Sequence, residues 1–264
     1  VSNNSTQSSE DTNAQNLKSP ETESKQLPLV VEPTKRQHSE IRYIAKIIVD
    51  YHLAKPKIDN TLSENIYHSY LNVLDVDKSI FTLDDLKQFE KYKENFDNVI
   101  FTGWLKPVFE IYDLYHRNRI KRTKFFISLL DDNDILLMPE PDPQSRTDNW
   151  VKNSVEREAL WIKTVISDVK QLKDAKLAEL SIKTILKERY QSDLVTLNTV
   201  DSNFVYTTFV NAFTSTIDPH TTYFAATRYS SNNALNLNLA GLGLVLKTKG
   251  AYTEIIGLYE SGSA

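Results

Sequence analysis

The helical character of this chain is clearest in Trp104-Leu-Lys-Pro-Val-Phe-Glu-Ile-Tyr-Asp-Leu-Tyr115. Apolar side chains recur there at steps of three and four residues, the spacing that places them on one face of a helix. The same apolar side continues as far as Leu130. Pro107 is compatible with this helix because it falls in the first turn, where a missing N–H costs no hydrogen bond. The pattern predicts one long helix over about Trp104–Leu130.

Shorter periodic segments lie on both sides of this helix. Further helices are expected over about Ser39–Tyr51, after Thr61, after Thr82, and over about Leu160–Leu172, Leu177–Tyr190 and Phe204–Phe213. The pairs Thr61 with Glu64 and Thr82 with Asp85 are spaced like capping boxes. The proline-rich run Met138–Ser145 predicts an extended linker between two helical sets. The expected fold is mainly α, an irregular multi-helix domain without a fixed-length repeat.

The hydrophobic period changes after Pro219. Alternation over Leu235–Ala240 and the apolar runs Leu244–Leu246 and Tyr252–Ile256 predict short β-strands. Between them lies the loop Gly241-Leu242-Gly243-Leu244. Such a glycine turn can present consecutive backbone N–H groups to an anion, for example the terminal carboxylate of a peptide. Gly241, Leu242, Gly243 and Leu244 are therefore the candidate binding residues.

Composition narrows the class of protein. The 264 residues carry a net charge of -4 with a sequence pI near 5.8, which argues against a dedicated nucleic-acid binder. The absence of cysteine excludes disulfides, thiolate zinc sites and a Cys nucleophile. No apolar run approaches the roughly 18–20 residues that a membrane helix needs. The polar stretch from Val1 to about Gln26 is expected to be disordered, and the start at Val1 is compatible with removal of an N-terminal segment.

Two charged clusters suggest binding sites, and each also has a structural interpretation. Asp75-Val-Asp77-Lys-Ser79 begins like a calcium loop, but Ile80 and Leu86 stand where that loop needs Gly and Glu, so a turn between helices is favoured. A second cluster is basic and consists of His116, Arg117, Arg119, Lys121, Arg122 and Lys124. Most of these side chains are expected on the solvated face of the long helix, and nucleic-acid binding is the alternative.

No complete active site is visible in the sequence. Asp218-Pro-His220-Thr221 could hold a catalytic Asp–His pair, but Pro219 favours a structural turn. A nucleophile elbow, a phosphate-binding loop and a zinc-binding His-Glu-x-x-His are all absent. No two histidines have a spacing of three or four residues. We therefore assign no catalytic residue, no metal site and no cofactor.

An ordered set of short motifs resembles the tail-specific proteases, the C-terminal-processing serine peptidases of the bacterial periplasm. The motifs are Tyr67-His-Ser-Tyr-Leu-Asn-Val-Leu-Asp75, Ala159-Leu-Trp161, Lys187-Glu-Arg-Tyr190, Ile217-Asp-Pro-His-Thr221 and Leu239-Ala-Gly-Leu-Gly243. The resemblance covers about Gln37–Ala264. It implies a helical N-terminal domain that leads into a PDZ domain, with a Ser–Lys protease core and a helical region beyond. It also implies that Gly241–Leu244 receive the C-terminus of a substrate, although Leu244 stands where the family often has a smaller residue.

The resemblance completes the set of expectations. The domains are a disordered tail over 1–36, the helical N-terminal domain over 37–230 and an incomplete PDZ domain over 231–264. The catalytic Ser and Lys are expected beyond Ala264, so this chain alone is expected to be inactive. The resemblance implies protein substrates with apolar C-termini, an adaptor protein as a further partner and a periplasmic location. The alternative is a non-catalytic helical adaptor or scaffold that binds partner proteins.

Overall fold

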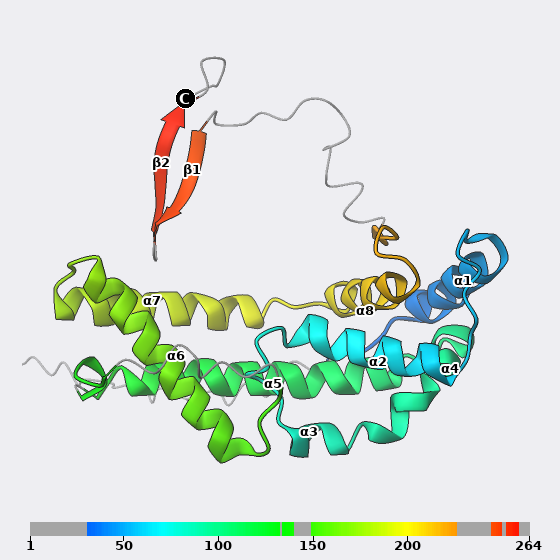
Figure 1. The fold of residues 1–264 in the computed structure, drawn as a ribbon, viewed down its shortest axis with the longest axis horizontal. Helices are drawn as coiled ribbons and strands as arrows, with labels where there is room; N and C mark the ends of the chain where they lie inside the picture. The colour runs from blue at the N-terminus through cyan, green and yellow to red at the C-terminus, as the bar shows by residue number, and fades with distance from the viewer. Residues whose placement is uncertain (1–30, 133, 140–148, 226–243, 250–251, 259–264) are drawn as a thin grey trace, which may run out of the picture.

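The computed structural model describes residues 31–132, 134–139, 149–225, 244–249 and 252–258, and they are mainly helical (Figure 1). The α-helices are α1 (Lys35–Tyr51), α2 (Asn60–Leu74), α3 (Leu83–Lys87), α4 (Phe96–Thr102), α5 (Lys106–Leu129), α6 (Ser154–Asp174), α7 (Glu179–Leu197) and α8 (Ser202–Ile217). Two short 3-10 helices, η1 (Glu90–Asn95) and η2 (Asp134–Leu136), complete the helical part. The mainly α prediction is confirmed.

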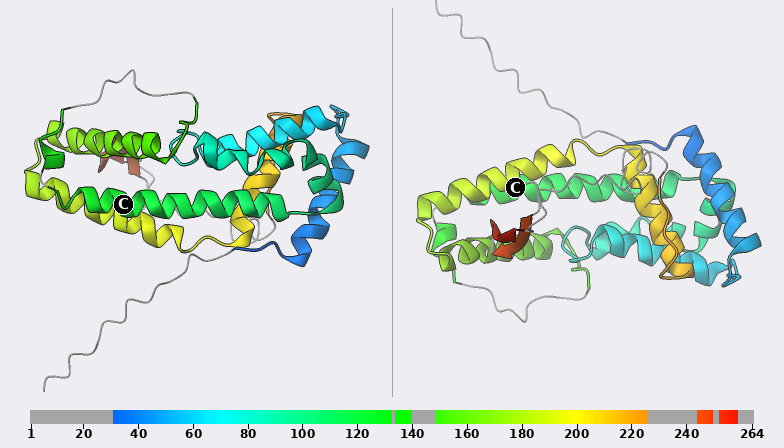
Figure 2. Two further views of the ribbon diagram at one scale, coloured as in Figure 1. Left: turned by 90° about the horizontal axis from the view of Figure 1, so that it is seen from below. Right: turned by 90° about the horizontal axis from the view of Figure 1, so that it is seen from above.

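The helices enclose two hydrophobic cores that share α5. The first core joins α1, α2, η1, α4, the first half of α5 and α8, whereas the second joins the end of α5, η2, α6 and α7. Along α5, Tyr112 and Tyr115 belong to the first core and Phe126 to the second. Figure 2 shows α2 and α6 along one long side of the molecule, α5 and α7 along the other, and α1 at one end. The long helix predicted around Pro107 is therefore the element that connects the two cores.

The helix caps confirm one of the two predicted capping boxes. Thr82 and Asp85 exchange both hydrogen bonds at the start of α3. The prediction for Thr61 and Glu64 is wrong, because α2 begins earlier and the Asp59 carboxylate caps it by accepting a hydrogen bond from the Leu62 N–H. That N–H and the nearby Lys57 hold the pKa of Asp59 below its ordinary value.

Several element boundaries differ from the expected ones. Helix α1 begins at Lys35, before the expected Ser39, because Thr34 and Gln37 form a capping box there. Helix α7 continues from the expected end at Tyr190 to Leu197. Most of the predicted extended linker, residues 140–145, lies outside the described residues. No helix in the described part of the chain combines the length and apolar character that a membrane span requires.

Two strands follow the helices. β1 (Leu244–Lys249) pairs antiparallel with β2 (Tyr252–Leu258), and Leu244 lies opposite Leu258. The expected strand over Leu235–Ala240 lies outside the described residues, as do most of the expected disordered tail and Gly241–Gly243. The assignment of this hairpin to a PDZ domain, and the three domain boundaries, stay predictions.

Buried tyrosines should make the fold sensitive to alkali. Burial raises the pKa of Tyr67 to about 12, and burial together with a hydrogen bond to Glu110 raises the pKa of Tyr92 to about 12. The folded chain therefore keeps these phenol protons while the unfolded chain loses them from pH 10 upward, so stability should fall between about pH 10 and 12. Absorbance of phenolate at alkaline pH should show a late group of tyrosines that titrates only with loss of helical circular dichroism. Simple titration of every tyrosine near pH 10 with the fold intact would contradict this.

Candidate functional site

Three of the four predicted binding residues cannot be located. Gly241, Leu242 and Gly243 lie outside the described residues, and Leu244 is described only as the first residue of β1. The structure does show how the chain leaves the helices on its way to this loop. We call residues 218–225 the connecting segment, and its contacts with α1 and α8 form the candidate site.

The connecting segment begins with a tight turn at Asp218. The Thr221 N–H donates to the Asp218 carbonyl at 3.0 Å, and the His220 N–H donates to Asp218 Oδ1 at 3.2 Å. The His220 side chain is exposed. This confirms the structural turn that Pro219 predicted and leaves Asp218 and His220 without the geometry of a catalytic pair.

His52, the residue that follows α1, holds the turn through a chain of hydrogen bonds with a fixed direction. The Ala54 N–H donates to His52 Nδ1 at 3.1 Å, so in the neutral ring Nε2 carries the proton. Nε2 then donates to Thr221 Oγ1 at 2.9 Å, and the Thr221 hydroxyl donates to Asp218 Oδ2 at 3.2 Å. A general base for Thr221 would need an unprotonated nitrogen facing the hydroxyl. The cluster therefore fixes the turn and does not activate a nucleophile.

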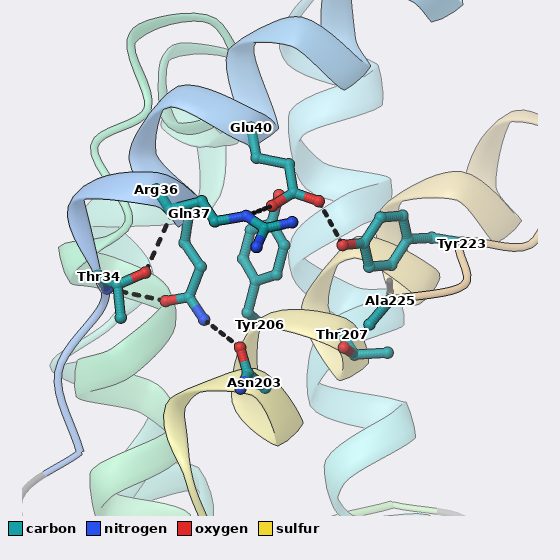
Figure 3. A pocket seen from close by; sticks show the side chains of 9 residues that line it. All are labelled: Thr34, Arg36, Gln37, Glu40, Asn203, Tyr206, Thr207, Tyr223 and Ala225. Carbon is teal, nitrogen blue, oxygen red and sulfur yellow. Dashed lines mark hydrogen bonds and ion pairs between the residues drawn. The ribbon is translucent and has the colours of Figure 1, made fainter. Parts of the chain in front are cut away.

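The end of the connecting segment is fixed by Asn211 on α8. Its side-chain oxygen accepts from the Tyr223 N–H at 2.8 Å, and its amide nitrogen donates to the Tyr223 carbonyl at 3.3 Å. The Tyr223 hydroxyl donates to Glu40 of α1 at 2.5 Å, as Figure 3 shows. Burial and this carboxylate both raise the pKa of Tyr223. The segment is therefore bound to both helices at once.

A small pocket lies under Tyr223 between the N-terminal ends of α1 and α8 (Figure 3). Gln37, which is 2% exposed, crosses between the helices and donates to Asn203 Oδ1 at 3.2 Å. The Tyr206 hydroxyl is buried without a hydrogen-bond partner. Burial, followed by the charge of Glu40, raises the pKa of Tyr206. The volume of about 40 Å³ suits one or two water molecules, so the pocket cannot hold a peptide substrate.

Replacing Asn211 by alanine should release the connecting segment. The variant leaves the N–H and carbonyl of Tyr223 without protein partners, at a cost of about 1–2 kcal/mol in local stability. Amide hydrogen exchange over residues 221–225 should accelerate roughly tenfold, while exchange in α6 stays unchanged. Asn98→Ala, an exposed helical asparagine, is the matched control. Equal protection of residues 221–225 in both variants would show that other contacts suffice.

The aspartate that begins the calcium-like motif organises a turn between α2 and α3. Asp75 is 2% exposed, and its carboxylate accepts four N–H groups at 2.8–3.1 Å. The donors are the backbone N–H groups of Ser79, Ile80 and Phe81 and the indole Nε1 of Trp150. Because these donors occupy the carboxylate, the turn interpretation is confirmed. Among the described residues, no group of three acidic or histidine side chains could hold a metal ion.

A buried ion pair joins the two cores beside this turn. Arg157 of α6 is 4% exposed, and its Nη1 donates to Asp85 Oδ2 at 2.7 Å and to the Ile80 carbonyl at 2.9 Å. Trp161, one helical turn further along, is fully buried and donates from Nε1 to the Ser79 carbonyl at 2.7 Å. Sequence reasoning missed Arg157 and the role of Trp150. A charged residue four positions before a core tryptophan, on the same helical face, was the available signal for Arg157.

The basic cluster is less exposed than its sequence suggested. Arg117, Lys121 and Lys124 are exposed, as expected, but His116 is 2% exposed and bonds to the Leu197 carbonyl at 2.8 Å. Arg119 and Arg122 are half-buried, so the expectation was wrong for these three. Both continue the stripe of Tyr115 and Phe126: Arg119 donates to the Tyr115 hydroxyl, and Arg122 lies over the Phe126 ring. Burial, followed by the charge of Arg119, lowers the pKa of Arg122.

The described residues thus define a helical scaffold, and hydrogen bonds hold the connecting segment, residues 218–225, against it. A family model described as the tail-specific protease N-terminal domain matches residues 44–227, nearly all of the helical part. The chain therefore belongs to this family, and the resemblance seen in the sequence is confirmed. It is also similar to a tail-specific protease of Haemophilus influenzae, with 32% identity over 210 residues, or 75% of this chain.

The same alignment covers 29% of the Haemophilus influenzae protein, so the chain spans less than a third of that relative's length. The matched part is a protease-associated N-terminal module. Its relationship to a protease rests on the family match and on this relative.

Proposed function

We propose that this chain is the substrate-handling N-terminal part of a periplasmic serine endopeptidase that degrades or processes proteins from apolar C-termini. In this proposal the helical scaffold holds the segment that leads into a PDZ domain. Gly241, Leu242, Gly243 and Leu244 of that domain bind the substrate's terminal carboxylate. Catalysis by a Ser nucleophile and a Lys base belongs to other residues of the whole protein. No cofactor is needed for this chemistry.

The observation that carries the proposal is the place where the chain leaves the scaffold. The family match ends at residue 227, just beyond the connecting segment that Asn211, His52 and Glu40 hold against α8 and α1. The glycine loop follows at Gly241. A connecting segment that is hydrogen-bonded to the scaffold is what we expect of a module that positions a substrate-binding loop relative to its helices.

Peptide binding and cleavage by the whole protein test the proposal. A reporter with an apolar C-terminus should be cut, and amidation of its terminal carboxylate or a Gly243→Val change should reduce cleavage by an order of magnitude or more. The chain itself should cut nothing. Equal cleavage of free and amidated tails would remove carboxylate recognition, and cleavage by the chain itself would remove the assignment of catalysis to other residues.

The alternative function is a non-catalytic adaptor or scaffold that binds partner proteins. The exposed basic residues Arg117, Lys121 and Lys124 on α5 favour a partner with an acidic surface. Stable capture of one partner by the whole protein, without cleavage of any unfolded reporter, would favour this alternative over the protease.

A further inference from the structure

One end of the molecule exposes apolar side chains over a short distance. On α1 and in the turn after it, Tyr43 is 66% exposed, Tyr51 81% and Leu53 96%, and Ile47 is 41% exposed. Tyr43, Ile47 and Tyr51 follow one another at four-residue steps and so share a face of α1. The opposite face, with Ile41, Ala45 and Ile48, is buried in the first core. Figure 2 places α1 at the end of the molecule. We call Tyr43, Ile47, Tyr51 and Leu53 the apolar tip.

The same stretch is positively charged in an otherwise acidic chain. Residues 35–57 contain six Lys or Arg and two Asp or Glu, a net charge of +4, whereas the whole chain carries -4. The exposed basic side chains include Lys35, Arg42, Lys46 and Lys55. Arg42 and Lys46 lie on the solvent side of α1, on either side of Tyr43 in the sequence. Exposed basic groups therefore lie beside the apolar tip on the solvent side of α1, which also carries the exposed Asp50.

The turn that carries Leu53 has a defined shape. The Lys55 N–H donates to the His52 carbonyl at 3.1 Å, and the Ala54 N–H donates to the His52 ring at 3.1 Å. Lys55 adopts a left-handed φ of 40°, which closes the turn. The turn holds Leu53 away from the first core, with Lys55 beside it. A leucine held outward in this way must be covered by something other than its own domain, or stay in water.

We propose that the apolar tip and its basic residues bind an anionic lipid bilayer. Tyrosine and leucine side chains insert at the boundary between head groups and acyl chains, where the amphipathic tyrosine ring is favoured. Lysine and arginine around them are attracted by the negative surface of anionic lipids. The net charge of +4 over residues 35–57 favours an anionic bilayer as the occupant of this surface, and binding to a second copy is a separate outcome of the test. Binding would hold the proposed protease module at a membrane surface.

Flotation of the full chain with vesicles tests this inference. Vesicles of equal parts phosphatidylglycerol and phosphatidylcholine should retain the chain, and vesicles of phosphatidylcholine alone should not. Retention should disappear at about 1 M salt, where the Debye length is about 3 Å. The double variant Tyr51→Ser/Leu53→Ser should reduce partitioning about tenfold or more, because it removes the inserted apolar area. Lys46→Glu should reduce it at least about fivefold.

Matched variants on other helices distinguish binding through the apolar tip from non-specific adsorption of the chain to vesicles. Leu180→Ser on α7, 81% exposed, and Lys124→Glu on α5 make the same kinds of change away from the apolar tip and should leave partitioning unchanged. Circular dichroism of each variant checks that the fold is intact. Equal retention on neutral vesicles, an equal loss with the α7 and α5 variants, or no retention at all would overturn the proposal. So would dimerisation through Tyr51 and Leu53 without vesicle binding, which would assign the tip to a second copy.

Discussion

Replacing Asp75 by alanine is expected to lower the free energy of unfolding by about 4 kcal/mol, because the variant leaves buried N–H donors without an acceptor. Three backbone N–H groups, those of Ser79, Ile80 and Phe81, and the indole of Trp150 converge on its carboxylate. Each buried donor without a partner costs about 1–3 kcal/mol, and local relaxation should recover part of the sum. Urea unfolding followed by circular dichroism measures the change.

Asp77 provides the matched control. It is the second carboxylate of the same calcium-like motif, but its side chain is exposed. Asp77→Ala should change the unfolding free energy by less than about 0.5 kcal/mol. Calcium should stabilise neither the natural chain nor the variants. Similar losses at both positions, together with stabilisation by added calcium, would replace the turn interpretation with a metal site.

Helices with a regular apolar stripe and a clear local start signal could be predicted from the sequence. The helix expected over Trp104–Leu130 is α5, Lys106–Leu129, because its apolar stripe and Pro107 mark the same boundaries. Local signals failed at α2, where Asp59 and Thr61 are both good capping residues. Tertiary contacts decide between them: Ser63 bonds to Asp97 at 3.0 Å, and Glu64 pairs with Lys93 at 3.3 Å instead of capping the helix.

The exposure of Arg119 and Arg122 could not be predicted from charge alone. Solvated faces usually carry arginine, but α5 passes between two cores, and its middle is covered from more than one side. The guanidinium groups lie over aromatic rings there, and their long stems pack like apolar side chains. A prediction of two cores sharing one helix would have been needed first.

In the candidate site, too, the local turn could be predicted from the sequence, whereas the long-range hydrogen bonds could not. The turn at Pro219 follows from its own residues, whereas the bonds to His52, Asn211 and Glu40 join positions up to 183 residues apart. Sequence spacing carries no sign of them. The role of the glycine loop stays a prediction, since Gly241, Leu242 and Gly243 are not among the residues that the structure describes.

Replacing Arg157 by alanine should destabilise the chain by about 3 kcal/mol, near the lower end for a broken buried ion pair because Asp85 is partly exposed. The variant leaves Asp85 and the Ile80 carbonyl without this donor. Since Arg157 belongs to α6 and both acceptors lie beside the first core, the loss also weakens the link between the two cores. Urea unfolding should therefore become broader, with probes of α6 and α2 separating into two transitions.

Two further variants distinguish the loss of this link from the loss of any arginine. Arg157→Lys should recover at least half of the stability, because a single nitrogen, Nη1, makes both hydrogen bonds and a lysine ammonium can donate to the same two oxygens. Arg117→Ala, which removes an exposed pair with Asp113, should cost less than about 0.5 kcal/mol. A single sharp transition in Arg157→Ala, at unchanged steepness, would mean that α5 and the remaining contacts, such as the hydrogen bond from Trp161 to the Ser79 carbonyl, couple the cores without the ion pair.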